Sequence, residues 1–139
     1  MARKLKDIMT SSVTTVTRET PLRDVARVMR DNHIGDVVVT DRGSLVGILT
    51  DRDLVVRGIA EGRPIETCKA GDVCSEKVVQ LDPEATDEEA VKLMRQSAVR
   101  RIPVVDHGTL VGIVSIGDLA QLKDPNSALA EISAAPANR

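Results

Sequence analysis

The sequence contains no phenylalanine, tyrosine or tryptophan among its 139 residues. This absence removes the aromatic platform on which non-specific single-strand binders stack bases. It also removes the aromatic cages that hold methylated amines and the aromatic belts of membrane interfaces. Any purine that this protein holds must therefore lie against aliphatic, methionine or backbone surface.

Strong charge of one sign and long apolar segments are also missing. The 19 basic and 21 acidic residues give a formal net charge of −2, so no positive field attracts a nucleic acid. No segment approaches the roughly 18 apolar residues that span a bilayer. The basic start, Met1–Lys6, does not have the apolar stretch of a signal peptide. We therefore expect a cytoplasmic protein without a membrane partner, and nucleic-acid binding is the weakest function class.

Cysteine and histidine are scarce. Cys68 and Cys74 are too few for a disulfide framework, and with two distant histidines they match no strong zinc spacing. Reduced thiols are the main interpretation, and redox pairing stays open. His33 and His107 accompany no nucleophile elbow, Walker loop or dinucleotide glycine motif. The sequence therefore predicts no metal site and no enzyme.

An internal repeat organises the chain. A shift of about 65 residues carries the segment 43–50 onto 108–115, with glycine, leucine and valine at the same places. The same shift carries Asp53 onto Asp118. Two copies of one supersecondary unit are therefore expected, the first at 4–60 and the second at 70–122. A linker at 61–69 separates them, and a partly helical C-terminal tail at 123–139 follows.

Each copy begins with a short helix, a small strand and an amphipathic helix. The pattern predicts the short helices at 5–9 and 70–74 and the small strands at 13–16 and 78–81. In the first copy Thr20 is the expected N-cap with Pro21 as the first helical residue, and Thr86 with Glu89 resembles a capping box in the second. The apolar stripe expected on the first amphipathic helix is Leu22, Val25, Ala26 and Met29.

Two strands and a last helix complete each copy. The strands are expected at 37–40 with 45–49, and at 102–105 with 110–114, each pair joined by a tight turn. The last helices start near Thr50 and Ser115. Such a unit of strand, helix, strand, strand and helix is too small to bury much core alone. An α/β (α+β) fold with two pseudo-symmetric repeats packed face to face, and related clefts where they meet, is therefore expected.

The candidate site is the corner where the last strand enters the last helix. There Thr50 and Ser115 each place a hydroxyl at a helix N-terminus, whose N–H groups favour an anion. Asp53 and Asp118, one turn further on, could accept hydrogen bonds from a ribose diol. The same spacing is also that of an ordinary capping box, so both interpretations stay open.

Two further features separate the copies. Arg100 and Arg101 precede the middle strand of the second copy, where they could clamp phosphates or simply be surface arginines. Gly35 and Asp36 stand at the equivalent positions of the first copy, and Gly117 stands where the first copy has Arg52. The two clefts are therefore not expected to suit anions equally.

These motifs together resemble a tandem pair of CBS domains, also called a Bateman module. The resemblance rests on Asp7-Ile8-Met9-Thr10, on the segment 100–106, and on the segment 45–53 with its second copy. It covers residues 4 to about 122 and is similar to short bacterial proteins that consist of little beyond the pair. It implies a βαββα fold for each repeat, sheets that pack on one another, and a homodimer.

The resemblance also implies a ligand. The family's clefts bind AMP, ADP, ATP or S-adenosylmethionine, with none of them required as a cofactor. Carried over to this sequence, the phosphate or ribose hydroxyls are Thr50 and Ser115, and the ribose-binding carboxylates are Asp53 and Asp118. Arg52 joins the first corner. The adenine-contacting backbone is Ile34, Gly35, Asp36, Val37, Val99, Arg100, Arg101, Ile102 and Pro103. The purine walls are the segments 10–13 and 75–78, with Thr10, Val13 and Val78 among them.

The expected function is that of a regulatory module. An adenosine-containing ligand would shift a homodimer between two states that a partner protein reads. The alternative is a dimerisation or protein-interaction module without a ligand. One departure from the family pattern is Val38, which stands where the second copy has Pro103. Another is Asp36, whose charge would repel a phosphate. We therefore expect unequal occupancy, with the more anionic ligand in the cleft nearer Arg100 and Arg101.

Overall fold

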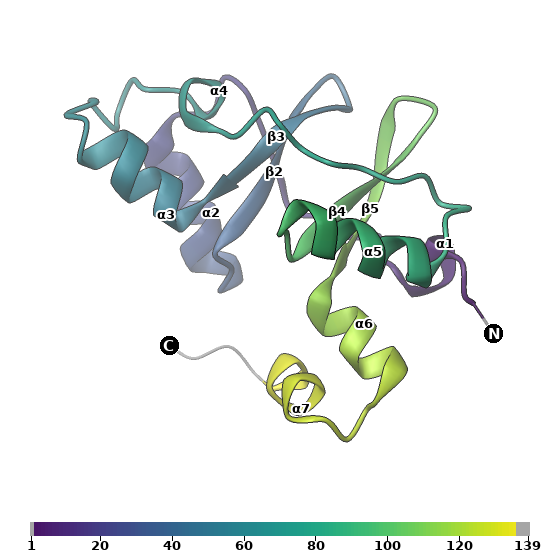
Figure 1. Ribbon diagram of the computed structural model, residues 1–139. Coiled ribbons are helices and arrows are strands. Elements are labelled where there is room, and N and C mark those ends of the chain that lie inside the picture. The colour runs from purple at the N-terminus through teal and green to yellow at the C-terminus, as the bar shows by residue number, and fades with distance from the viewer. Residues whose placement is uncertain (1, 136–139) are drawn as a thin grey trace. The chain divides into compact units, whose positions relative to one another are not determined.

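The computed structural model describes residues 2–135, which form two compact units. The first-repeat unit comprises residues 14–78, and the second-repeat unit comprises residues 2–13 together with 79–135. The spatial division therefore differs from the sequence repeat at one point. The short helix that begins each repeat belongs to the unit of the other repeat (Figure 1).

The first-repeat unit contains a three-stranded sheet and four helical segments. The strands are β1 (Thr15–Thr17), β2 (Asp36–Asp41) and β3 (Ser44–Thr50), and the helices are α2 (Leu22–Asn32), α3 (Asp51–Asp53), the π-helix η1 (Leu54–Ile59) and α4 (Ala70–Val73). β1 is parallel to β2, and β2 is antiparallel to β3. The predicted hairpin and the short helix at 70–73 are thus confirmed, and the first small strand lies slightly later than predicted.

The second-repeat unit repeats this plan with one strand fewer. It contains α1 (Leu5–Ile8), α5 (Asp87–Ser97), β4 (Arg101–Asp106), β5 (Thr109–Ser115), α6 (Ile116–Lys123) and α7 (Ala128–Ala134). β4 and β5 form an antiparallel pair with the same register irregularity that β2 and β3 have. The predicted mixed helix-and-strand fold with two sheets is confirmed.

The predicted strand at 78–81 is wrong, and Pro103 gives the physical reason. In the first-repeat unit the Val38 N–H donates to the Thr14 carbonyl at 3.2 Å, which helps to hold β1 on β2. Pro103 occupies the position of Val38 and has no N–H to donate. Only Leu81 then bridges to β4, beside Val104, so the segment does not extend into a strand.

Two details of the first amphipathic helix also differ from prediction. Thr20 does not cap α2, because its hydroxyl accepts the Thr17 N–H at 3.1 Å, and Pro21 is the N-cap residue. Ala26 is exposed, so the buried stripe is narrower than predicted and contains Leu22, Val25 and Met29. In the other repeat Thr86 is the N-cap of α5, since its hydroxyl accepts the Glu89 N–H at 3.2 Å, and this is one half of the predicted capping box.

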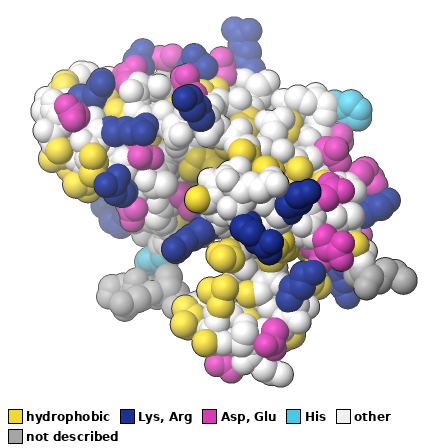
Figure 2. Space-filling view, in the orientation of Figure 1, with side chains coloured by type: hydrophobic (Ala, Val, Ile, Leu, Met, Phe, Trp, Pro, Cys, Tyr) yellow, Lys and Arg dark blue, Asp and Glu magenta, His cyan; other side chains and the backbone are white. Residues whose placement is uncertain are grey.

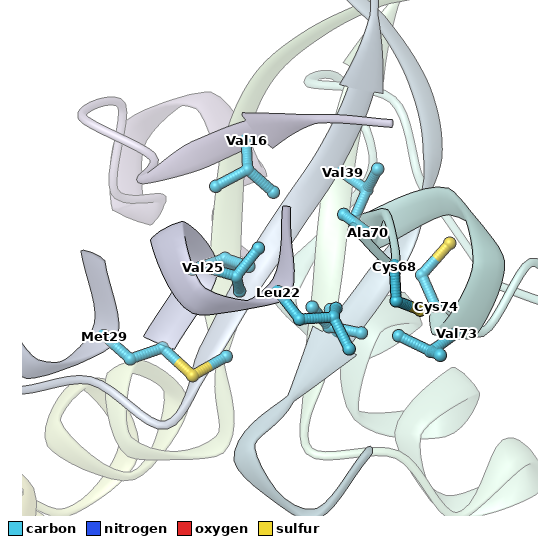
Figure 3. Packing of buried hydrophobic residues seen from close by; sticks show 11 residues of the cluster. Val16, Leu22, Val25, Met29, Val39, Cys68, Ala70, Val73 and Cys74 are labelled. Atoms are coloured by element: carbon cyan, nitrogen blue, oxygen red, sulfur yellow. The ribbon is translucent and has the colours of Figure 1, made fainter. Parts of the chain in front are cut away.

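Each unit has its own hydrophobic core. Each core includes side chains from the segment that the other repeat contributes, which we call the exchanged segment: residues 70–78 in the first-repeat unit and residues 2–13 in the second-repeat unit. In the first-repeat unit Ala70, Val73 and the two cysteines pack with residues of α2 and the sheet (Figure 3). In the second-repeat unit Leu5 is fully buried among residues of α5, the β4–β5 pair and α6. The short helices therefore act as core elements of the units that they join.

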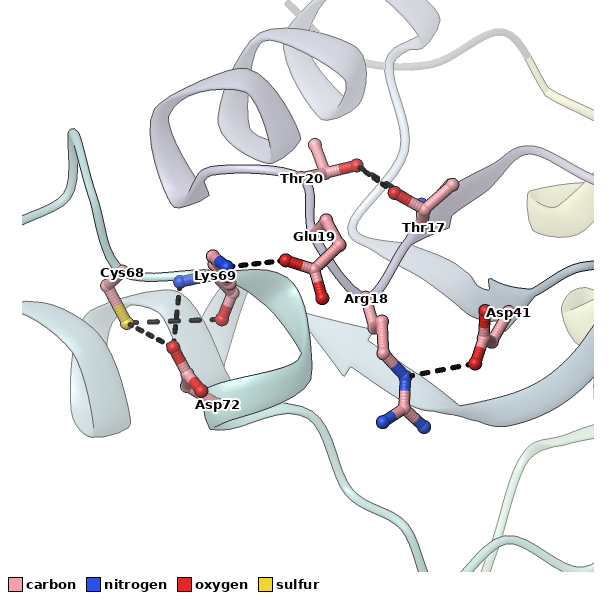
Figure 4. A network of polar contacts seen from close by, with 8 residues as sticks. All are labelled: Thr17, Arg18, Glu19, Thr20, Asp41, Cys68, Lys69 and Asp72. Atoms are coloured by element: carbon pink, nitrogen blue, oxygen red, sulfur yellow. Dashed lines mark hydrogen bonds and ion pairs between the residues drawn. The ribbon is translucent and has the colours of Figure 1, made fainter.

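Polar contacts hold α4 in the first-repeat unit. The Ala70 N–H donates to the Thr20 carbonyl at 2.8 Å, and the Gly71 N–H donates to the Arg18 carbonyl at 2.9 Å. Lys69 pairs with Glu19 at 2.5 Å, beside the Arg18–Asp41 ion pair (Figure 4). The attachment thus combines backbone hydrogen bonds with exposed ion pairs.

The start of the chain is held in the second-repeat unit by two carboxylates. Asp87 is only 3% exposed, accepts the Arg3 N–H at 2.9 Å and lies 3.1 Å from the Lys123 ammonium. Burial alone would raise the pKa of Asp87, but these donors leave it below its usual value. Glu84 pairs with Lys4 at 2.6 Å and with Lys6 at 2.9 Å, and these ammonium groups lower its pKa to about 2.

One glycine in each unit allows the exchanged segment to cross the last strand. A Cβ atom on Gly47 would lie 2.2 Å from the Ser75 carbonyl oxygen, and one on Gly112 would lie 2.4 Å from the Met9 Sδ. Ser75 exchanges backbone hydrogen bonds with Ile48, and Thr10 exchanges them with Ile113. The crossing is therefore the same in both units, and it leaves no space for a side chain.

We expect Gly47→Ala to destabilise the protein more than Gly112→Ala. The new methyl group would lie 2.2 Å from a fixed backbone carbonyl in the first case. In the second its nearest contact is the flexible Met9 side chain, and the Thr10 carbonyl oxygen is 3.0 Å away. Overpacking of this kind costs about 3 kcal/mol when nothing can move and about 1 kcal/mol when a side chain can. Urea unfolding of both variants tests this, and equal midpoints would contradict it.

The Glu84 ion pairs predict a pH-dependent contribution to stability. Because the folded-state pKa of about 2 lies below the ordinary value of 4.5, the contribution is present above about pH 4.5 and is lost as the pH falls towards 2. Glu84→Gln should therefore be less stable than the parent protein at pH 7 and equally stable near pH 2. Urea midpoints across this range measure it, with the exposed Glu131→Gln as a control. A constant difference would argue against the ion pairs.

Candidate functional site

The two candidate corners have the same hydrogen bonds. At the start of α3 the Thr50 N–H donates to Asp53 Oδ2 at 2.9 Å, and the Asp53 N–H donates to Thr50 Oγ1 at 3.1 Å. At the start of α6 the Ser115 N–H donates to Asp118 Oδ2 at 2.9 Å, and the Asp118 N–H donates to Ser115 Oγ at 3.2 Å. Both corners are therefore capping boxes, which confirms the structural interpretation of the spacing without deciding whether a ligand also binds.

Most of the N–H groups that were expected to attract an anion already have partners. The Asp51 N–H donates to the Gly35 carbonyl at 2.9 Å, and the Ile116 N–H donates to the Arg100 carbonyl at 2.8 Å. The Arg52 N–H donates to Asp51 Oδ1 at 2.8 Å. A ligand at these corners would therefore meet chiefly the hydroxyl and carboxylate oxygens of the box and the side chains around it.

The strand register places the predicted neighbours beside each corner. Asp36 pairs with Thr50 across β2 and β3, and Arg101 pairs with Ser115 across β4 and β5. The structure therefore assigns the acidic neighbour to the first corner and the Arg100–Arg101 pair to the second. Sequence alone left open which corner the arginines accompany.

The remaining predicted residues divide between the two units. Ile34, Gly35, Asp36, Val37 and Val78 belong to the first-repeat unit, with Thr50, Arg52 and Asp53. Val99, Arg100, Arg101, Ile102, Pro103, Thr10 and Val13 belong to the second-repeat unit, with Ser115 and Asp118. Val37, Ile102 and Pro103 are buried, whereas Arg52, Arg100 and Arg101 are exposed. Each unit thus contains one corner, its predicted adenine-contacting residues and one of the two predicted purine walls.

Two contacts at the corners were not predicted. Asp53, whose side chain is only 16% exposed, lies 3.8 Å from the Arg57 guanidinium one turn along the helix. The spacing of four residues is a recognisable signal for such a pair. Gly117, in α6, lies against α7, and the sign of this in the sequence is that a glycine stands where the first copy has Arg52.

The two cysteines lie in the hydrophobic core, and the two histidines lie at a helix end and in a turn. Cys68 and Cys74 are both free and buried, and burial raises the pKa of the Cys74 thiol. His33 ends α2 in a left-handed conformation, and His107 lies in the exposed turn between β4 and β5. Among residues 2–135, no three His, Cys, Asp or Glu side chains gather closely enough to hold a metal ion.

Within the described part of the chain, no helix has both the length and the apolar character needed to cross a membrane.

The fold and the duplicated corner define a known class of protein. A sequence profile described as the CBS domain matches residues 5–58 and again residues 70–123. The chain therefore belongs to the CBS domain family, as a tandem pair, and the predicted family resemblance is confirmed.

Particular relatives cover almost the whole chain. The chain is 40% identical to the CBS domain-containing protein YhcV of Bacillus subtilis over 133 residues, which is 93% of this chain and 94% of that protein. The crystal structure of Hypoxic Response Protein I with two coordinated zinc ions has a TM-score of 0.80 and 36% identity, covering 86% of this chain and 98% of that one. A hexameric CBS-CP12 protein from bloom-forming cyanobacteria has a TM-score of 0.74 and 26% identity, covering 95% and 76%.

Proposed function

We propose that this protein is a regulatory module that binds an adenosine-containing ligand and acts, as a homodimer, on a partner protein. The observation that carries the proposal is the corner in which Ser115 and Asp118 lie beside Arg100 and Arg101. A hydroxyl and a carboxylate at a helix start, with two arginines at the start of the neighbouring strand, are the kinds of group that bind a ribose phosphate.

The carboxylates have capacity for a sugar. An ionised carboxylate can accept about four hydrogen bonds, and the capping box uses one position of each aspartate. The rest of the carboxylate can accept the two hydroxyls of a ribose. The Ser115 or Thr50 hydroxyl, which accepts one helix N–H, can still donate its own hydrogen to a phosphate oxygen.

The purine would be held without aromatic stacking. The sequence has no aromatic residue, so the adenine ring would lie on aliphatic side chains such as Val13 and Val99, both half-buried. Backbone groups at the starts of β2 and β4 would contact its edge. The class of ligand comprises AMP, ADP, ATP and S-adenosylmethionine, and family membership supports it.

The two corners should differ in their preference for charge. The second corner lies beside Arg100 and Arg101 and can balance the charge of a phosphate. The first corner lies beside Asp36, which opposes one, although Arg52 partly offsets this. The more anionic ligand is therefore assigned to the Ser115 corner.

Heat unfolding with AMP, ATP and S-adenosylmethionine tests the proposal. A ligand at 100 times its Kd should stabilise the folded protein by about 2.7 kcal/mol. Asp118→Ala should abolish most of the ligand-induced shift with AMP, and Asp53→Ala should reduce it less. The shift is compared within each variant, because loss of a cap by itself lowers stability. No shift with any of the three compounds would overturn ligand binding.

One observation favours the alternative, an interaction module that dimerises without a ligand. Val55, Val56 and Ile59 on η1 are 55%, 39% and 61% exposed, and hydrophobic side chains gather at the surface over α3 and η1 (Figure 2). Exposed aliphatic side chains on one helix are typical of a protein–protein contact. The hexameric CBS-CP12 relative supports oligomerisation in general terms.

If η1 forms the contact between copies, Val55→Glu with Ile59→Glu should convert the dimer to a monomer. Two buried charges without partners would oppose association. Light scattering after size-exclusion chromatography measures the mass. Ile132→Glu is the matched control, because Ile132 is 72% exposed on another helix. A dimer that survives the double substitution would place the contact elsewhere.

A further inference from the structure

The C-terminal helix α7 lies against the first turn of α6. A Cβ atom on Gly117 would be 2.5 Å from Ser133 Oγ and 2.8 Å from Ser133 Cβ. It would also be 3.6 Å from Ser115 Oγ, the hydroxyl of the capping box. Ser133 therefore fills the space that a side chain at position 117 would take, immediately beside the second candidate corner.

The first repeat shows what otherwise occupies this space. Arg52 and Gly117 are both the second helical residue after their N-caps, Thr50 and Ser115. The two caps have nearly the same backbone angles, with φ −106° and ψ 164° in the first and φ −114° and ψ 163° in the second. Their Cβ directions therefore correspond. Where the first corner presents an exposed arginine, the second presents a serine from α7.

The docking of α7 is specific but small. Ser127 caps the helix by accepting the Ala130 N–H at 3.1 Å, and Ala130 is only 1% exposed. The larger side chains Leu129 and Ile132 remain 41% and 72% exposed. A helix of seven residues has little stability of its own in water, so α7 depends on this contact to stay folded.

We propose that α7 and the anionic part of a ligand compete for the space at Gly117, so that a ligand entering the Ser115 corner releases the C-terminal helix. The inference rests on the proposed function and adds to it a conformational change, the undocking of α7. A phosphate that accepts a hydrogen bond from the Ser115 hydroxyl on the side of Gly117 would meet the Ser133 side chain. Undocking would expose Ala130, which lies on α7 beside the already exposed Leu129 and Ile132.

The competition sets the size of the expected effect. When only a fraction of the molecules is competent to bind, the apparent Kd rises by the inverse of that fraction. If α7 is docked about nine-tenths of the time, its removal should lower the Kd about tenfold.

The first test compares AMP binding by calorimetry to the full chain and to a chain that ends at Lys123. The shorter chain should bind AMP about tenfold more tightly. Adenosine, which has no phosphate, should show a smaller difference between the two chains. Equal AMP affinities would overturn the competition. Absence of binding of AMP, ATP and S-adenosylmethionine by both chains would instead overturn the proposed function, so the two failures are distinguishable.

The second test measures docking directly. Hydrogen exchange of the 128–134 amides in the full chain should become up to about tenfold faster at saturating AMP, because a helix docked nine-tenths of the time exchanges from the remaining tenth. Gly117→Ala should speed the exchange without any ligand, because its methyl group would meet Ser133. Gly117→Ala with Ser133→Gly should restore slow exchange by removing that side chain. Glu131→Gln, on an exposed residue of α7, is the control and should exchange like the parent protein. Unchanged protection of α7 when AMP is bound would overturn the proposal.

Discussion

The close crossing of backbone over Gly47 and Gly112 is the constraint on which the rest of the structure depends. At each glycine a segment from the other repeat passes over the last strand, so near that any side chain would collide with it. The crossing brings Ala70 and Val73 into one core and Leu5 into the other. It also places Ser75 and Thr10 on the strands that lead directly into the candidate corners. Core packing and the geometry of the corners therefore both require glycine at positions 47 and 112.

The order of helices and strands was predictable because the same pattern of residues occurs in both repeats. The hairpins, the short helices at 5–8 and 70–73, and the N-caps Thr50 and Ser115 all follow from local patterns. Errors arose where a residue acts through a distant partner. Pro103 removes a hydrogen bond to a segment more than twenty residues earlier, and the shift by which the repeats align does not show that loss. Thr20 fits the pattern of a cap, but its hydroxyl is taken by Thr17.

The candidate corners were located correctly as helix starts, but the sequence predicted only their local contacts and not their contacts with distant residues. The spacing of Ser115 and Asp118 gives the capping box, since those contacts are local. The pairing of Arg101 with Ser115 needed the strand register. The contact of Ser133 with Gly117 needed the path of the C-terminal tail, which composition describes only as alanine-rich. A glycine that interrupts an otherwise duplicated motif was the one visible trace of that contact.

The exchange of short helices bears on how such a chain could arise. Because Leu5 and Ala70 are equivalent under the repeat, each helix sits in the sister unit at the place that its own unit fills with the other helix. A single ancestral repeat would complete its core by exchanging this helix with an identical molecule in a domain-swapped dimer. Joining two such molecules end to end would convert an exchange of helices between two chains into an exchange within one chain. Gene duplication here would then have preserved an assembly that already existed.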